Sequence, residues 1–169
     1  MSPTDLERLY DEHASALFAF LLNVTRNEAD TRDLLQELFV KLARQPELLR
    51  GVRDERGFLL RLSHNAAIDA LRRRGTRDKK HDAMGSETAG AFASSPDPDE
   101  QAFRNAVSVA LEQLPPEQRA VVHLKLWEGW TFDAIAGALD LPPNTVASRY
   151  RYGLDKMRER LRPLYEEIK

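Results

Sequence analysis

Polar and basic side chains line one side of a helix predicted near the C-terminus. Between Pro143 and Ile168 apolar residues recur at steps of three and four, which predicts an amphipathic helix. Its buried stripe consists of Val146, Tyr150, Leu154, Met157 and Leu161. Arginine donates to guanine edges or phosphates, and hydroxyl groups donate to phosphate oxygens. The first turns therefore present candidate DNA contacts on the other side: Asn144, Thr145, Ser148, Arg149, Arg151 and Tyr152.

A shorter helix and a tight turn precede this helix and must position it. Thr131 can cap a helix whose apolar residues are Phe132, Ile135, Ala136 and Leu139, and the turn 140–142 follows. Small Ala136 lies where the two helices must approach closely. This combination predicts a helix-turn-helix, whose second helix enters the major groove. The helix lengths, the turn and the surface polarity favour DNA binding over an ordinary solvated helix end.

A second basic cluster ends a helix predicted from Phe58 to Arg74. Its cations suit phosphate contact, since each neutralised phosphate adds a salt-dependent increment of affinity: Arg72, Arg73, Arg74, Arg77, Lys79 and Lys80. Upstream, an aromatic ring and polar groups can meet unstacked bases: Phe58, Arg61, His64 and Asn65. The alternatives are compensation of the helix dipole by the arginines and a core position for Phe58.

Charge is sorted along the chain in blocks. The 169 residues carry 25 Lys and Arg against 27 Asp and Glu, a net charge of −2 that alone argues against a nucleic-acid partner. Segment 50–80, however, holds ten of the basic residues and four of the acidic ones, whereas segment 81–100 holds five acids and no Lys or Arg. A local block matters more to a phosphate backbone than the total charge does.

Catalytic, metal and membrane functions find little support. The chain has no cysteine, and its four histidines (13, 64, 81 and 123) are scattered, which predicts no metal site. Phosphate-binding glycine loops, HExxH and GxSxG are absent, so neither an enzyme nor a cofactor is expected. No apolar run approaches the roughly 20 residues of a membrane span, and the N-terminus is acidic. A cytoplasmic protein without membrane insertion is predicted.

The hydrophobic pattern predicts an all-α protein of two small helical domains. A flexible acidic linker, 77–99, is rich in Gly, Ala, Ser and Pro, and it separates domain 1–76 from domain 100–169. Three helices are expected in the first domain, with Thr4 capping one and Asn27 capping the next. The second domain opens with two further helices, one of them spanning 116–127 from Pro116.

The second predicted helix has a charged outer face. Its inner stripe is Leu34, Leu35, Leu38, Phe39 and Leu42, and its outer residues include Asp33, Gln36, Glu37, Lys41 and Arg44. Such faces usually only meet water. Composition alone does not indicate a partner for it.

Three segments together resemble the extracytoplasmic-function (ECF) sigma factors of bacterial RNA polymerase. DLLQELFVKL looks like the polymerase-docking helix of that family, and RGFLLRLSHNAAIDALRRR looks like its promoter-melting segment. The segment from LPPEQRAVV to DKMRERL is similar to its C-terminal DNA-binding domain. The match spans residues 5–162 in the family's order and includes the linker. It is therefore far more specific than a lone helix-turn-helix.

The resemblance implies partners and roles for particular residues. It implies binding to core RNA polymerase, through a surface that includes Asp33, Gln36, Glu37 and Phe39. It also implies binding to promoter DNA, with Arg61, Asn65 and loop 50–57 at the −10 element and with Ser148, Arg149, Arg151 and Tyr152 at the −35 element. An anti-sigma factor is a further implied partner. Phe58 replaces the usual Trp and Ala147 the usual Lys or Arg, so the promoter sequence cannot be taken from relatives.

Two other functions are compatible with the residues. A stand-alone regulator would bind an operator through residues 131–153 as a homodimer, with tight duplex binding unaided. A helical adaptor would bind only proteins. It would show no salt-dependent affinity for DNA, and substitution of Arg149 or Arg151 would not change its binding.

Overall fold

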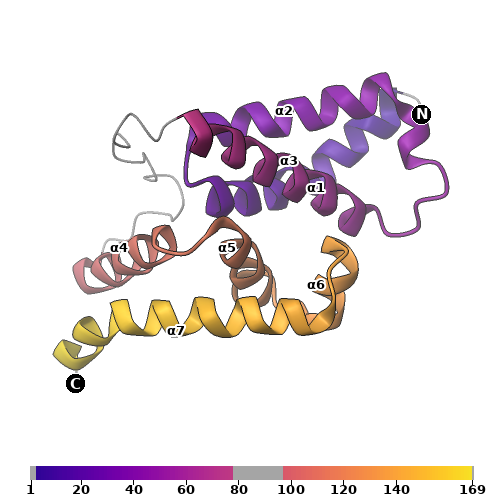
Figure 1. Cartoon of the computed structure of the whole chain (residues 1–169). Coiled ribbons are helices and arrows are strands. Elements are labelled where there is room, and N and C mark those ends of the chain that lie inside the picture. The colour runs from indigo at the N-terminus through magenta and orange to yellow at the C-terminus, as the bar shows by residue number, and fades with distance from the viewer. Residues whose placement is uncertain (1–2, 78–96, 169) are drawn as a thin grey trace.

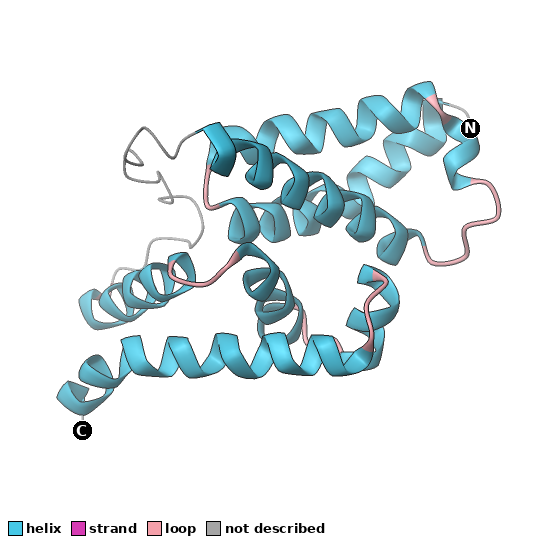
Figure 2. Cartoon of the chain, in the orientation of Figure 1, coloured by secondary structure: helices cyan, strands magenta, loops and turns pink. Residues whose placement is uncertain are grey.

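Within each of its two described ranges, the chain folds into helices joined by short loops (Figures 1 and 2). A computed structural model describes residues 3–77 and 97–168, and within these ranges it contains no strand. The predicted all-α fold is confirmed. Most of the predicted linker lies outside the described residues, but residues 98 and 99 already belong to a helix.

Three long helices form the N-terminal group: α1 (Pro3–Thr25), α2 (Glu28–Arg44) and α3 (Glu55–Arg77), with a short 3₁₀ turn η1 (Pro46–Leu49) between the last two. Asn27 caps α2 as predicted, since its side chain accepts a hydrogen bond from the Asp30 backbone N–H at 2.9 Å. Thr4 does not cap α1, because Pro3 already lies in that helix. Helix α3 also begins and ends three residues beyond its predicted bounds.

The C-terminal group consists of α4 (Pro98–Glu112), α5 (Pro116–Val122), α6 (Phe132–Leu139) and α7 (Pro143–Ile168). Thr131 caps α6 by accepting from the Ala134 N–H at 3.1 Å, and Asp140 ends it in the left-handed conformation, with φ of 57°. The predicted single helix 116–127 is wrong in its second half. A π-helix, η3 (His123–Trp127), continues α5, and the Glu128 N–H donates to the His123 carbonyl five residues back.

The two helix groups pack against each other. Figure 1 shows α5 and α6 between α7 and the N-terminal helices, where α5 lies against α1 and α6 against α3. One continuous apolar core runs from Leu9 and Phe20 through Leu59 to Val121 and Ile135. A smaller cluster joins α4, α5 and α7 through Leu111, Val122 and Met157. The two predicted domains are therefore in contact in this conformation.

Several large apolar side chains lie at the surface, although apolar periodicity places them on the inner sides of helices. They are about half exposed: Tyr10 51%, Phe103 48% and Leu126 50%, with Trp127 at 38%. The exposure of Leu126 and Trp127 results from the π-helix. Its wider turn rotates their side chains out of the stripe that a continuous α-helix would bury.

Gly153 allows α7 to approach α5. A Cβ atom at this buried position would lie 2.9 Å from Cγ2 of Val122, a fully buried β-branched side chain with little rotamer freedom. We expect Gly153→Ala to lower the free energy of unfolding by about 1–2 kcal/mol, because overpacking outweighs the gain in helix propensity.

Urea denaturation tests this, with Gly137→Ala as the matched control. Gly137 lies within α6, and a Cβ atom there would meet nothing within 4 Å. That substitution is expected to stabilise by about 0.5–1 kcal/mol. Equal stabilisation by both substitutions would contradict the close approach at Gly153.

Candidate nucleic-acid interface

The first turns of α7 present most of the predicted DNA contacts to solvent. Asn144, Arg151 and Tyr152 are exposed, and Thr145, Ser148 and Arg149 are half-buried. Val146 is fully buried and the Tyr150 ring packs edge-on against Phe132 at 5.3 Å, so the opposite side of α7 is anchored in the helix-turn-helix.

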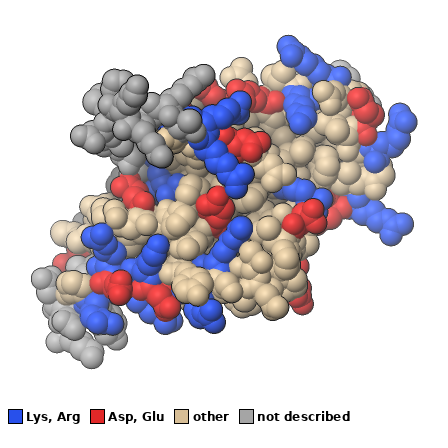
Figure 3. All heavy atoms as spheres, in the orientation of Figure 1, with Lys and Arg blue, Asp and Glu red and all other residues tan. Residues whose placement is uncertain are grey.

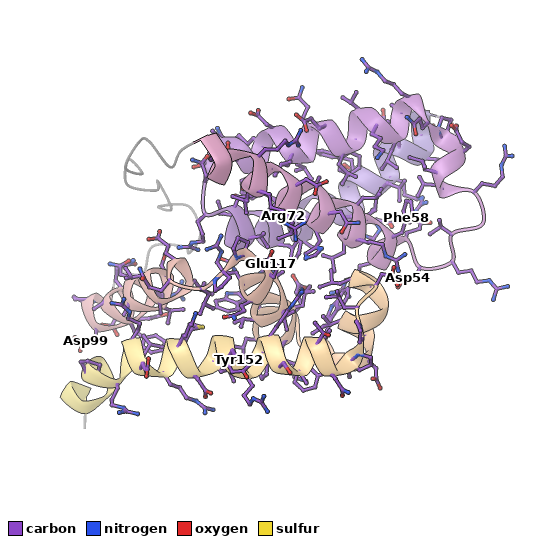
Figure 4. All side chains as sticks on the ribbon, viewed as in Figure 1. Asp54, Phe58, Arg72, Asp99, Glu117 and Tyr152 are labelled. Atoms are coloured by element: carbon purple, nitrogen blue, oxygen red, sulfur yellow. The ribbon has the colours of Figure 1, made fainter. Side chains whose placement is uncertain are left out.

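Two of these side chains stack on each other. The Arg151 guanidinium lies 5.3 Å from the centre of the Tyr152 ring, and Figure 4 places Tyr152 in the middle of α7. Tyr152 is 55% exposed, which is unusual for so large a ring. The pair therefore offers a cation and a hydroxyl from a single spot on the helix surface.

The predicted contacts on α3 are less accessible than those on α7. Phe58 is half-buried and packs against the main core, which agrees with the core alternative for this ring. Arg61 donates from Nε to the Ala138 carbonyl at 2.9 Å and from Nη2 to the Gly137 carbonyl at 2.7 Å. Only Asn65 of this group is exposed. The predicted surface for unstacked bases is thus partly covered by α6.

The basic end of α3 is partly neutralised by acidic neighbours. Arg72 lies 3.7 Å from Glu117 of α5, and the two face each other across the boundary between the helix groups (Figure 4). Arg74 donates from Nη2 to Asp30 of α2 at 2.7 Å, whereas Arg73 is exposed. Figure 3 accordingly shows basic and acidic side chains interspersed on this face of the molecule.

The predicted docking residues on α2 divide between surface and core. Asp33, Gln36 and Glu37 are exposed, but Phe39 is only 9% exposed and packs edge-on against Tyr10 at 5.1 Å. Phe39 still lines an apolar groove of about 660 Å³ between α1 and α2, together with Gln36 and Tyr10. The outer face of α2 therefore combines an exposed polar edge with an apolar groove.

A group of buried polar residues that the sequence analysis did not identify joins the two helix groups. The Asn23 side chain on α1 donates to His123 Nδ1 at 2.7 Å, and Asn23 Oδ1 accepts from Arg26 at 3.0 Å. Arg119 on α5 donates to the Val24 carbonyl at 3.0 Å. Burial lowers the pKa of His123 to about 4 and that of Arg119 to about 10. Only the apolar surroundings of these polar residues hinted at such burial.

One cluster in the described part of the chain has the composition of a metal site. Ligand atoms of Glu12, His13 and Glu55 lie within 4.8 Å of one another. Arg8 donates to Glu12 at 3.0 Å and to Glu55 at 3.1 Å, so both carboxylates are already engaged by a cation. We interpret the cluster as an ion-pair network that ties α1 to the start of α3.

Comparison with known proteins covers both helix groups. Residues 9–77 match the family model for Sigma-70 region 2, and residues 104–157 match the model for Sigma-70, region 4. The RNA polymerase sigma factor CarQ of Myxococcus xanthus is 34% identical over 167 residues, covering 96% of this chain and 92% of CarQ. The chain belongs to the ECF sigma factors.

Further relatives agree with this assignment. The ECF sigma factor SigL of Mycobacterium tuberculosis is 31% identical over 161 residues, covering 94% of this chain and 90% of SigL. The solved structure of the sigma factor RpoE of Bartonella quintana, in complex with the anti-sigma factor NepR, is similar with a TM-score of 0.74. It covers 94% of this chain and 97% of that one at 19% identity, so it supports the fold alone.

Membership of the family establishes the function that the resemblance implied. This ECF sigma factor binds core RNA polymerase and promoter DNA, and it initiates transcription. It is not an enzyme, and the operator-binding regulator and the adaptor are no longer needed to explain the residues. Over the described residues, no helix is both long and apolar enough to cross a membrane.

Proposed function

We propose that this sigma factor divides promoter recognition and polymerase docking among three surfaces. The outer face of α2 docks on core RNA polymerase, α3 contacts the −10 element, and α7 contacts the −35 element. The observation that carries this proposal is the exposure of a distinct set of side chains on α2 and on α7, on separate helix groups. Segments 1–76 and 100–169 would then be the two working domains, joined through 77–99.

The −35 assignment is supported by the chemistry of α7. Ser148, Arg149, Arg151 and Tyr152 supply guanidinium and hydroxyl donors from its first turns. Asn144 and Thr145 precede them at the N-terminal end of the helix, which is the end that enters the groove in helix-turn-helix proteins.

The −10 assignment is supported by the residue types on α3. Asn65 is exposed and Arg61 lies one turn before it on the same helix, while Arg72, Arg73 and Arg74 supply cations for phosphates. Flipping a base out of the duplex costs a few kcal/mol, which contacts of this kind must offset. Phe58 is half-buried against the main core, so its ring offers less surface to a base than an exposed ring would.

We further propose that an anti-sigma factor controls this protein and that it acts in the cytoplasm. The similar RpoE structure contains an anti-sigma factor, NepR. The cytoplasmic location follows from its partner, since core RNA polymerase and promoter DNA are found there.

Removal of two exposed side chains from α2 tests the docking surface. We expect the double variant Gln36→Ala, Glu37→Ala to bind core RNA polymerase at least about tenfold more weakly, because truncation of a central interface residue costs about 2 kcal/mol. Both side chains are exposed, so the fold should be unaffected. Co-elution of the purified chain with bacterial core polymerase on a sizing column measures this.

The matched control is Glu7→Ala, Asp11→Ala on α1. These two exposed acidic residues lie on the side of α1 opposite its buried stripe. The control should co-elute like the wild type. If the α2 variant co-elutes equally well, the polymerase docks elsewhere on the chain.

A further inference from the structure

Tyr152 packs against the side chain of its neighbour Arg151 and not against the core. Its ring is 55% exposed, and it belongs to neither apolar cluster of the described residues. The Arg151 guanidinium lies 5.3 Å from the centre of this ring. That distance is within the range of about 6 Å over which a cation is attracted to an aromatic face. The ring therefore restrains a guanidinium that would otherwise move freely in solvent.

The backbone of α7 is held in place beside this pair. Gly153 follows Tyr152 directly and is buried against α5, where a Cβ atom would lie 2.9 Å from Val122. On the same buried side of α7, the ring of Tyr150 packs edge-on against Phe132. Tyr152 thus extends from a fixed backbone, and a tyrosine ring has only two rotatable bonds to order. It can support a longer and more flexible side chain.

Arg151 differs from two arginines further along α7 in what holds it. Arg158 lies 3.9 Å from Asp155, and Arg160 donates to Gln113 at 3.2 Å. In the described part of the chain, no acidic side chain forms an ion pair with Arg151. A stack occupies the face of a guanidinium, whereas its N–H donors lie in the plane and point outward from the edge. The hydrogen-bonding edge of Arg151 is therefore left for a partner outside the chain.

Orientation matters for a contact with a base and much less for a contact with a phosphate. A guanidinium recognises guanine by donating two hydrogen bonds, to O6 and N7, in the major groove. This contact requires one orientation of the planar group, and ordering a long side chain opposes binding. A cation near a phosphate carries no sequence information and needs no single orientation. A guanidinium that is already oriented is therefore most useful at a guanine.

We propose that Tyr152 is a positioning residue, which orients Arg151 toward a guanine in the −35 element. The pair then sets the preference for guanine at that position, and Tyr152 contributes through its ring and not through its hydroxyl group. Phenylalanine could fill the same role, whereas leucine could not. This inference rests on the proposed function, since it takes α7 as the −35 surface.

Selection from a randomised duplex pool by the complex of this chain with core RNA polymerase measures the base preference at every position. Arg151→Met keeps an unbranched stem and removes the guanidinium, so it marks the position that Arg151 contacts. We expect the wild-type complex to prefer guanine there by at least about tenfold, and the variant to lose this preference. The preferences at the other selected positions should be unchanged.

Two substitutions of Tyr152 test its role in this preference. Tyr152→Leu removes the ring, and we expect it to lower the guanine preference at the same position by about two- to fivefold, the strength of an exposed cation–π contact. Tyr152→Phe keeps the ring and removes only the hydroxyl group, so its guanine preference should equal that of the wild type. Since the side chain is exposed, both variants should keep a native helical signal in circular dichroism.

Arg158→Met is the matched control on the same helix. Arg158 is exposed and is not assigned to DNA, and its replacement removes the same charge as Arg151→Met does. The control should leave the base preference at every position as in the wild type. An equal loss of the guanine preference in the control would mean that charge alone sets it, which would overturn the proposal.

The remaining outcomes separate the positioning role from the proposed function. If Tyr152→Leu leaves the position marked by Arg151→Met unchanged, or relaxes a different one, Tyr152 does not orient Arg151, and the −35 assignment of α7 stands. If Tyr152→Phe relaxes that position as much as Tyr152→Leu does, the hydroxyl group acts and the stack does not. If Arg151→Met weakens binding to all sequences equally, Arg151 contacts only a phosphate and the proposal is wrong. If it changes neither preference nor affinity, the −35 assignment of Arg151 fails as well.

Discussion

Replacement of both Arg149 and Arg151 by alanine is expected to weaken promoter binding by roughly a hundredfold. A good guanidinium contact to a base edge contributes about 1–3 kcal/mol to binding. Each lost phosphate contact also reduces the slope of log affinity against log salt concentration by about one. The expected result is a lower affinity of the polymerase-bound chain for duplex promoter DNA and a shallower salt slope. A promoter for this measurement is obtained by selection from a randomised duplex pool with the wild-type complex.

A matched pair of arginines further along α7 provides the control. Arg158 and Arg160 are exposed and have the same two-residue spacing, and their replacement removes the same charge. Arg158 lies 3.9 Å from Asp155 and Arg160 donates to Gln113, so neither is assigned to DNA. If both double variants lose affinity equally, the effect is one of net charge, and α7 does not contact the −35 element through its first turns.

Acidification is expected to destabilise the folded chain by up to about 3 kcal/mol through His123. Burial lowers the pKa of this imidazole from 6.5 to about 4. Between these two values the unfolded chain binds more protons than the folded chain, so stability rises with pH. The contribution of His123 to the free energy of unfolding is fully present above pH 6.5 and is lost as the pH falls toward 4. Each unit of difference between the two pKa values corresponds to about 1.36 kcal/mol.

The hydrogen bonds around His123 explain why the neutral ring is preferred. Because Asn23 Oδ1 accepts from Arg26, its amide nitrogen must face His123 Nδ1, which therefore accepts. The proton of the neutral ring then lies on Nε2, which is 3.5 Å from a Glu128 oxygen. A second proton on Nδ1 would meet the Asn23 N–H group and break the bond between the helix groups. The carboxylate of Glu128 offsets only part of the burial cost.

Urea titrations at a series of pH values between 4 and 7.5 measure this contribution. The variant His123→Gln keeps a hydrogen-bond acceptor for Asn23 but cannot titrate, so its stability should depend less on pH. A residual slope is expected from His64, whose pKa burial also lowers. An unchanged slope in His123→Gln would assign the acid sensitivity to other groups.

The helices were predictable because each buries one stripe of its own side chains. The stripe of α2, from Leu34 to Leu42, is buried throughout, and local hydrogen bonds at Asn27 and Thr131 mark the helix starts as expected. Such signals depend on residues within four positions of each other. The family resemblance rested on the same local segments.

The contacts between the helix groups were not predictable from periodicity. Asn23 and His123 lie 100 residues apart, and neither has a neighbour in sequence that indicates a partner. Arg61 looked like a DNA contact from its place on α3, but the structure also gives it two carbonyl acceptors on α6. Tyr10 follows the apolar spacing of α1 and is nevertheless about half exposed, since its ring lines the groove between α1 and α2 without being enclosed.

The orientation of the helix-turn-helix depends on the number of residues in the π-helix between α5 and α6. An α-helix that takes in one extra residue turns everything after it by about 100° relative to an uninterrupted helix. Segment His123–Trp127 accommodates such a residue, and α6 and α7 follow it. A one-residue deletion within this segment would change the direction in which α6, and the DNA-contacting α7 after it, follow α5, without replacing any side chain that α6 and α7 carry.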